Sequence, residues 1–444
     1  MASIKKFISK SPSFVQKMYY KLVPFHKRYG AEFTDTYNFL LHSMEFTPSQ
    51  LKDYQFFKLQ QLIASVYDNN TYYHELMTDY GVPRIIQSPS DVSKLPVLTK
   101  DLVEKNWSKL INKNYKEDQI VFKTSGSTGK KFMFLGNDNL YKREAAFVLR
   151  AFNMHGSSLY DKPSIWIRRY APKAGDPISY TDYELNRIYL SPFNLSPDTI
   201  EDYVENINKT SAETIVTYPS LANFMASLMY EKNLLFKKIK HLHVASEMIL
   251  PEWRDNIRSK IGLDLYAHYG MMEKVSFFSN FEGSDKYAES LEYGFTEIVN
   301  GDVIGTGFLN DVMPLIRYKP GDRAVKNRNS QYFNALPISV NDFIGRSTDM
   351  IYTKDGRKLA GVNFYTMMYK IPGVEMFQII QKSLDDIEVK FIPSSKFDKK
   401  TNSQISEGIH DRVGPCKIVI RPVEKINRSR SGKFKTIKNE CKLR

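Results

Sequence analysis

The chain has 444 residues, a length that exceeds most single domains and predicts two or more. Hydrophobic residues make up 42% and aromatic residues 13%, a composition that excludes an intrinsically disordered protein. The net charge of +14 and the pI near 9.3 favour an anionic partner, such as a nucleotide, an acidic sugar, a nucleic acid or a membrane surface.

Cysteine content and hydropathy indicate the compartment. The two cysteines, Cys416 and Cys441, are too few for a disulfide framework and form no CxxC zinc motif, which indicates a reducing environment. No apolar stretch approaches the roughly 18 residues of a membrane span, and the N-terminus lacks the apolar region of a signal peptide. We therefore expect a cytoplasmic protein.

Residues 4–28 alternate lysines with aromatic and aliphatic residues, a pattern that predicts a basic amphipathic helix. Two arrangements fit this helix. It could lie on a membrane surface, or it could pack on the protein with its lysines in water, and we favour the second.

Further along the chain, helix and strand signals alternate. Thr47-Pro-Ser-Gln50 is a capping box with proline in the first turn and predicts a helix after it. The strand-like run 213–217 is followed directly by Pro219, which predicts a helix beginning there. Strand-then-helix alternation is typical of α/β layers, so we expect an α/β fold.

A glycine- and hydroxyl-rich loop lies between two strand-like runs, 119–122 and 131–135. Its glycines allow positive φ and its backbone amides can form an anion nest, which together favour phosphate binding. It is not a Walker A loop, because only two residues separate its glycines. An ordinary hairpin turn is the alternative. The candidate phosphate-binding residues are Thr124, Ser125, Gly126, Ser127, Thr128, Gly129 and Lys130.

Five further blocks decide between these alternatives. In chain order they are Val244-Ala-Ser-Glu247, Tyr269-Gly-Met-Met-Glu273, Met313-Pro-Leu-Ile-Arg-Tyr-Lys-Pro-Gly-Asp322, Ile344-Gly-Arg-Ser-Thr-Asp349 and Ser431-Gly-Lys433. With the loop, they resemble the signature blocks of the adenylate-forming superfamily, which includes acyl- and aryl-CoA ligases and adenylation domains. The phenylacetate-CoA ligase-like branch is the most similar. Within it, the N-terminal half resembles members of capsular polysaccharide and O-antigen biosynthesis.

The resemblance implies a two-part architecture. Residues 1–348 would form a large N-terminal domain of layered sheet subdomains with helices, including a basic helical extension over about 1–45. Residues 349–444 would form a small mobile α+β lid domain, with Asp349 as the hinge. Asp355-Gly356, a strong hairpin signal, supports the start of a new unit here.

The resemblance also implies roles for the nucleotide-binding residues. Ser246 and Glu247 would lie against adenine, mainly through their backbone. Tyr269 would flank the adenine ring, and Gly270 would let the backbone approach, with Met271 and Met272 in the same block. Asp322 would accept hydrogen bonds from the ribose hydroxyls, and Arg346 would contact ribose or phosphate. Methionines stand where the family often has a small or hydroxyl residue, which puts a side-chain hydrogen bond to phosphate in doubt.

Two residues are predicted to be catalytic. Glu273 would coordinate Mg²⁺ between phosphate oxygens, a role that suits a hard carboxylate ligand. Lys433 matches the lysine that bridges the substrate carboxylate and the α-phosphate. Tyr218 and Ser220 are predicted to border the acyl pocket, although a buried aromatic and a helix cap are the alternative. His268 is a further candidate beside the carboxylate, although it could equally be structural.

These inferences predict an ATP- and Mg²⁺-dependent, AMP-forming ligase that activates a carboxylate and transfers it to an amine, sugar or thiol acceptor. Capsule or O-antigen biosynthesis is the expected pathway, with peripheral association with membrane glycan synthesis and no specific nucleic acid. The enzymatic alternative is an aryl- or acyl-CoA ligase, which would use CoA. The alternative of another class is a noncatalytic basic module that binds nucleic acid or membrane.

Overall fold

The computed structural model describes residues 7–23, 28–115, 119–123, 132–157, 162–173, 175–281, 284–346, 350–429 and 432–441. Within these residues no helix has both the length and the apolar character needed to cross a membrane. The predicted phosphate loop 124–130 and the hinge residue Asp349 lie outside the described residues.

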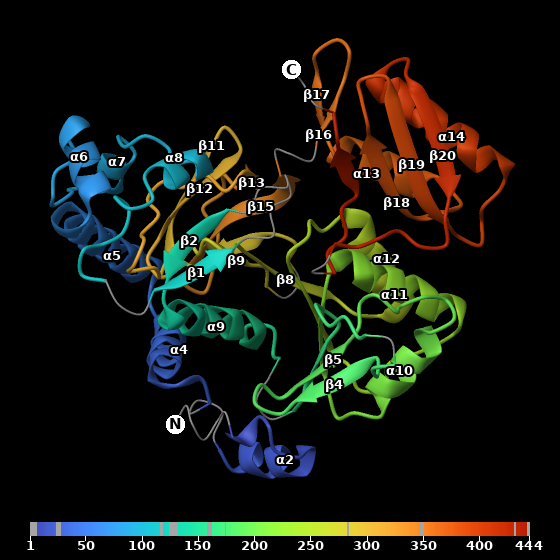
Figure 1. Cartoon of the computed structure of the whole chain (residues 1–444), viewed down its shortest axis with the longest axis horizontal. Helices are drawn as coiled ribbons and strands as arrows, with labels where there is room; N and C mark the ends of the chain where they lie inside the picture. The colour runs from blue at the N-terminus through green and yellow to red at the C-terminus, as the bar shows by residue number, and fades with distance from the viewer. Residues whose placement is uncertain are drawn as a thin grey trace.

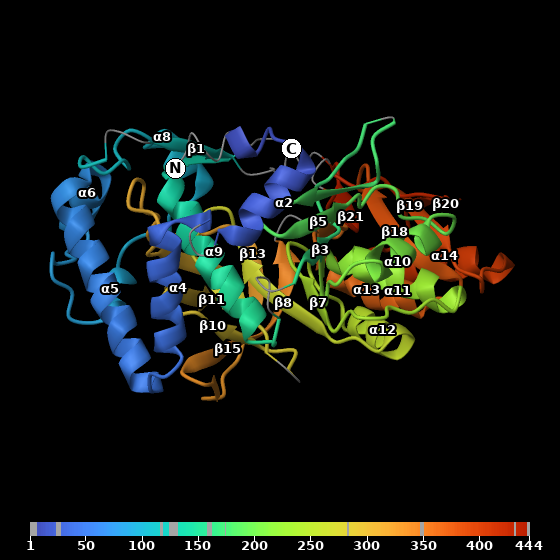
Figure 2. The ribbon, with the colours of Figure 1, turned by 90° about the horizontal axis from the view of Figure 1, so that it is seen from below.

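Helices dominate the N-terminal part of the chain. They are α2 (Ser13–Leu22), α4 (Ala31–Ser43), α5 (Pro48–Asn69), α6 (Thr71–Asp79), α7 (Pro89–Val92), α8 (Lys100–Lys105) and α9 (Asp138–Asn153). The capping box predicted before α5 is confirmed, because the Gln50 amide donates to Thr47 Oγ1 at 3.3 Å and the Thr47 amide donates to Gln50 Oε1 at 2.9 Å. Helices α4 and α9 pack side by side (Figures 1 and 2).

Among the described residues, thirteen strands form one mixed sheet, and β8 (Leu265–Gly270) joins its two halves. On one side β8 pairs in parallel with β7, and on the other it pairs antiparallel with β9. The parallel half also has an antiparallel edge strand, β4. The strands of this parallel half are β3 (Ser164–Trp166), β4 (Ser179–Asp182), β5 (Arg187–Leu190), β6 (Thr214–Thr217) and β7 (His241–Val244).

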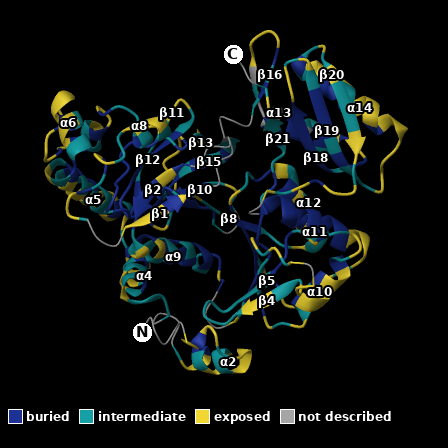
Figure 3. Cartoon of the chain, viewed as in Figure 1, coloured by how far each residue is buried: buried dark blue, intermediate teal, exposed yellow. Residues whose placement is uncertain are grey.

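Three helices belong to the parallel half: α10 (Ile200–Asn208), α11 (Pro219–Glu231) and α12 (Pro251–Ile261). The strand at 213–217 and the helix beginning at Pro219 are therefore both confirmed. Every residue of β6 is buried, as expected for a strand covered on both faces, and the central strands of this half appear dark blue in Figure 3.

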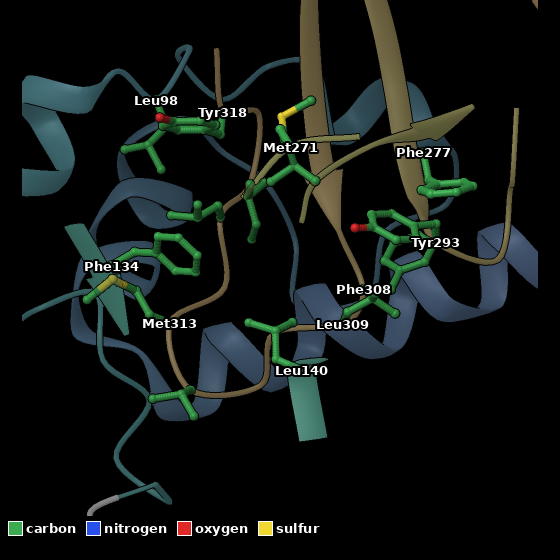
Figure 4. Close-up of a cluster of buried hydrophobic side chains, with 14 of the residues drawn as sticks. Leu98, Phe134, Leu140, Met271, Phe277, Tyr293, Phe308, Leu309, Met313 and Tyr318 are labelled. Carbon is green, nitrogen blue, oxygen red and sulfur yellow. The ribbon is translucent and has the colours of Figure 1, made fainter. Parts of the chain in front are cut away.

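The antiparallel half is formed by β9 (Phe277–Ser279), β10 (Tyr287–Glu289), β11 (Gly294–Val299), β12 (Asp302–Gly307), β13 (Asp322–Lys326), β14 (Tyr332–Phe333) and β15 (Leu336–Arg346). A hydrophobic cluster links it to α9 and to the hairpin β1 (Ile120–Lys123) and β2 (Met133–Gly136), as Figure 4 shows. Both strands beside the predicted phosphate loop are thus present.

The C-terminal part has its own four-stranded mixed sheet, in the order β20-β19-β18-β21. Its elements are the hairpin β16 (Met350–Tyr352) and β17 (Lys358–Ala360), followed by α13 (Val362–Lys370), β18 (Val374–Gln381), β19 (Asp386–Pro393), α14 (Lys399–Val413), β20 (Lys417–Pro422) and β21 (Ile437–Asn439). The expected α/β class, with a large sheet region and a small C-terminal sheet, is confirmed (Figure 1).

Candidate active site

The predicted site residues gather where the parallel strands end. Tyr218 follows β6, Ser246 follows β7, and Tyr269 lies next to Gly270, the last residue of β8. Arg168, which the sequence interpretation did not include, follows β3. Strand β3 pairs with β5 on one side and β6 on the other, so the chain reverses its direction of travel across the sheet between β3 and β6. In open α/β sheets, ligands bind outside the carboxyl ends of the strands at such a reversal.

The residues predicted to bind adenosine lie together although they are far apart in sequence. The Tyr269 hydroxyl donates to Asp322 Oδ2 at 2.9 Å. One face of the Tyr269 ring is covered by Phe343, with ring centroids 3.8 Å apart. Arg346 faces Asp322 across the β13–β15 pairing. Hydrogen bonding and stacking thus hold the tyrosine and the aspartate in fixed positions, as a nucleoside site requires.

Glu273 is a buried carboxylate, with 6% of the residue exposed. Its Oε1 accepts a hydrogen bond from the Tyr318 hydroxyl at 3.1 Å, and the Tyr318 ring packs on Phe132, the first described residue after the predicted phosphate loop. Burial raises the pKa of Glu273, and the nearby Asp322 carboxylate raises it further.

A magnesium ion is compatible with this position. The described residues contain no group of three or more metal-ligating side chains, so phosphate oxygens and water would have to complete the coordination of a metal at Glu273. That is the usual ligand set of Mg²⁺ bound with a nucleotide. A cation would also offset the unfavourable burial of the Glu273 carboxylate.

Met271 has its side chain in the hydrophobic core, 9% exposed, in the cluster of Figure 4. Its contribution to nucleotide binding would therefore come from its backbone. The segment after β8 lies directly on β12, where a Cβ at Gly307 would stand 2.3 Å from the Lys274 carbonyl oxygen. Only glycine permits this close approach, which fixes the segment that carries Glu273.

Lys433 lies in a tight turn at the same edge. Its amide donates to Ser429 Oγ at 3.1 Å, and its carbonyl accepts from the Ser429 amide at 2.8 Å. Gly432 has φ +85°, and a Cβ there would lie 3.2 Å from the Tyr218 ring. The turn therefore packs directly on the end of β6.

Glu247 holds this turn in place. Its Oε2 accepts from the Ser220 amide at 3.1 Å, and its Oε1 accepts from the Phe434 amide at 2.5 Å. Arg428 lies 4.0 Å from Glu247 Oε1 and donates to Ser220 Oγ at 3.0 Å. The Glu247 side chain thus fastens the C-terminal segment to the start of α11, a role absent from the sequence interpretation, which assigned it to adenine through its backbone.

Several known proteins resemble this chain in sequence or in fold. Residues 351–440 match the family model of the CapK C-terminal domain. The chain is 24% identical over 355 residues to protein CapK of Staphylococcus aureus, covering 77% of this chain and 78% of that protein. It is 22% identical over 431 residues to the phenylacetate-coenzyme A ligase of Thermus thermophilus, covering 86% and 94%.

In sequence the chain is similar to proteins of the adenylate-forming ligase superfamily. Its fold is shared with 2-hydroxyisobutyryl-CoA ligase in the postadenylation state, in complex with R3-HIB-AMP. The TM-score is 0.66 at 15% identity, and the match covers 87% of this chain and 88% of that one. The same ligase in the thioesterification state gives a TM-score of 0.56.

Two arginines with buried side chains, Arg168 and Arg428, were not predicted from sequence. Arg168 is 7% exposed, stacks on the Tyr218 ring at 4.6 Å and donates to Ser246 Oγ at 2.7 Å. Burial lowers the pKa of Arg168 and of Arg428. The one signal in the sequence is an apolar strand run that ends in two consecutive arginines, and this pattern does not distinguish a buried arginine from an exposed one.

The residues predicted to border the substrate also lie at this strand edge. Tyr218 and Ser220 are fully buried beside the Lys433 turn, and substrate contact by them stays a prediction. Burial, together with the charge of Arg168, lowers the pKa of His268 to about 3, so its imidazole is neutral at physiological pH. His268 stacks on Phe277 with centroids 5.5 Å apart. A neutral, stacked histidine can orient a group but cannot supply a positive charge.

Proposed function

We propose that this protein is an ATP-dependent, AMP-forming ligase that activates a carboxylate as an acyl-adenylate and transfers the acyl group to an amine or another acceptor. The observation that carries the proposal is the docking of the Lys433 turn. Glu247 and Arg428 hold this turn beside Tyr218, at the strand edge that also carries Tyr269 and Glu273.

The chemistry requires two anions to meet. The carboxylate oxygen attacks the α-phosphorus of ATP, acyl-AMP forms, and pyrophosphate leaves. Lys433 would offset the charge of both reacting groups, while Asp322 and Tyr269 would hold the nucleoside and Glu273 would hold Mg²⁺. When bound, magnesium would neutralise charge on the phosphate oxygens. The residues of the predicted loop 124–130 would complete the phosphate site.

We further propose capsular polysaccharide or O-antigen biosynthesis as the pathway. The match to CapK over 77% of this chain supports this assignment, and so does the match of residues 351–440 to the CapK C-terminal domain. The acid would then be a sugar acid or amino acid, and the acceptor an amine or hydroxyl of a glycan precursor. Because the reaction consumes ATP, the cytoplasm is the compartment that supplies its cosubstrate.

Helix α2 supports a peripheral position at the membrane. Its segment exposes large apolar side chains, with Phe14 68%, Met18 64% and Leu22 80% exposed, while Tyr20 faces the protein. Lysines flank this exposed apolar surface, as expected for a helix at an anionic lipid surface. Flotation with anionic vesicles would test this position: Phe14→Ser/Met18→Ser should abolish co-flotation, and equal flotation of wild type and variant would contradict it.

A CoA ligase is the second candidate function, favoured by the similarity to phenylacetate-coenzyme A ligase over 86% of the chain. Pyrophosphate release from ATP and Mg²⁺ should be measured with uronic acids, amino acids and aryl acids, with and without CoA. Release with a sugar acid or amino acid that does not require CoA would support glycan ligation. AMP release that depends on CoA and an aryl acid would support the CoA ligase. No release with any acid would contradict both.

A further inference from the structure

Arg168 is a buried cation at the strand edge that forms no ion pair among the described residues. Its guanidinium donates to Ser246 Oγ and stacks on Tyr218, and both partners are neutral. Its Nε is buried and has no hydrogen-bond partner among the described residues. No ion pair of Arg168 with a carboxylate is present within the described part of the chain, where Glu247 is already occupied by Ser220, Phe434 and Arg428.

The charge balance of this edge is therefore incomplete. Arg168 and Arg428 contribute two positive charges, and Glu247 contributes the one carboxylate among the contacts described above. An isolated buried charge is strongly unfavourable, whereas a buried guanidinium paired with a carboxylate is well tolerated. A ligand that brings negative charge would correct the imbalance.

The geometry around Arg168 fits a planar anion. A guanidinium presents its donors in a flat fork that matches a carboxylate, and here the plane is fixed by Tyr218 on one face and Ser246 at one donor. Two neighbouring residues, Arg169 with φ +60° and Ser246 with φ +76°, adopt the left-handed conformation that non-glycine residues rarely take. Such backbone strain clusters at ligand sites.

We propose that Arg168 binds a carboxylate of the substrate acid, and this proposal rests on the proposed adenylating function. Two carboxylates could be the one bound. It is either the carboxylate that reacts with ATP or a second carboxylate of a diacid. In both cases Arg168 is the residue that makes the site select acids rather than neutral analogues.

The first test needs no turnover. Arg168→Met should unfold at the same temperature as wild type or higher, because it removes an unpaired buried charge. Sodium acetate, at ionic strength matched with chloride, should raise the unfolding temperature of wild type but not of Arg168→Met. Arg169→Met is the matched control, because this neighbouring arginine is exposed, and it should respond to acetate as wild type does. Equal responses of wild type and Arg168→Met, including none in either, would overturn the proposal.

The second test uses the acids that support pyrophosphate release by wild type. Arg168→Met should raise the KM for the acid by about tenfold or more and leave the KM for ATP nearly unchanged, and Arg168→Lys should recover part of the loss. A loss with every acid assigns Arg168 to the reacting carboxylate, whereas a loss confined to diacids such as succinate or L-glutamate assigns it to the second one. An unchanged KM for the acid in an active variant refutes the assignment but leaves the proposed function intact. If wild type bound acetate specifically but released no pyrophosphate with any acid, the Arg168 assignment would stand and the proposed function would be contradicted.

Discussion

On the antiparallel side of the site, Glu273 and Asp322 each accept a hydrogen bond from a tyrosine hydroxyl, whereas on the parallel side Arg168 and Arg428 have one carboxylate, Glu247, beside them. The acidic side therefore suits the neutral ribose and a metal cation, and the basic side suits the anions that react. A ligand that spans both sides would complete the charge balance of each, which is the arrangement that an acid and ATP require.

Among these variants, loss of the Lys433 side chain on the basic side should lower activity the most. Lys433→Ala should lower the rate of pyrophosphate release by three orders of magnitude or more, because a few kcal/mol of transition-state stabilisation would be lost at about 1.4 kcal/mol per factor of ten. ATP binding, measured by calorimetry, should be retained. Lys435→Ala, two residues away on the same segment, is the control and should stay near the wild-type rate. Equal loss in the two variants would mean that the effect is one of general charge.

Loss of the Glu247 charge should have the next largest effect. Glu247→Gln keeps an acceptor but removes the carboxylate beside Arg428, so the Lys433 turn should dock less tightly. We expect pyrophosphate release to fall by roughly 30-fold, or about 2 kcal/mol. Cleavage of segment 423–436 by trypsin should become faster.

Glu424 provides the control for this experiment, because it is exposed on the same segment. Glu424→Gln should leave both rates unchanged. If Glu247→Gln lowered turnover without faster cleavage, Glu247 would act on the ligand rather than through the turn.

On the acidic side, Asp322→Asn should raise the KM for ATP by about tenfold while changing kcat little, because the ribose is bound equally in the ground and transition states. Asparagine can still accept the Tyr269 hydroxyl, so the ring should stay in place. A double cycle with 2′-deoxy-ATP measures the contact itself. If Asp322 binds the 2′-hydroxyl, the deoxy substrate should weaken binding to wild type but much less to the variant. If the losses caused by Asp322→Asn and by 2′-deoxy-ATP were additive, Asp322 would not bind the 2′-hydroxyl.

The sequence interpretation included Lys433 and Glu247 on the basic side but missed Arg168 and Arg428, and the reason is physical. Tyr269, Glu273 and Asp322 stand in blocks whose order along the chain resembles a known family, and the elements around them follow from local signals such as the capping box at Thr47. Arg168 and Ser246 are 78 residues apart, and Glu247 and Phe434 are 187 apart. No local pattern encodes such contacts, because they depend on which strands are neighbours. The core position of Met271 was missed for the same reason.

The two halves of the sheet should also differ in their response to pH, although the effect is the smallest. Burial lowers the pKa of His155, which lies beside the parallel half and stacks on Tyr266 of β8, to about 4. Its stabilising contribution is complete above about pH 6.5, the unfolded pKa, and is lost as the pH falls toward 4. Burial raises the pKa of Glu289, on β10 of the antiparallel half, to about 7. Its contribution is complete below about pH 4.5 and is lost as the pH rises through 7.

Urea unfolding of single variants at pH 7 and pH 5 would measure these two contributions. When the pH falls from 7 to 5, His155 should lower the unfolding free energy of wild type by about 2 kcal/mol, and Glu289 should raise it by a similar amount. Relative to wild type, His155→Gln should therefore become more stable on acidification and Glu289→Gln less stable. Shifts of the same sign in both variants would mean that the halves do not differ in this way. Because each variant is compared with itself at two pH values, any loss of packing common to both conditions cancels, and the sign of the change reports only the proton bound or released on unfolding.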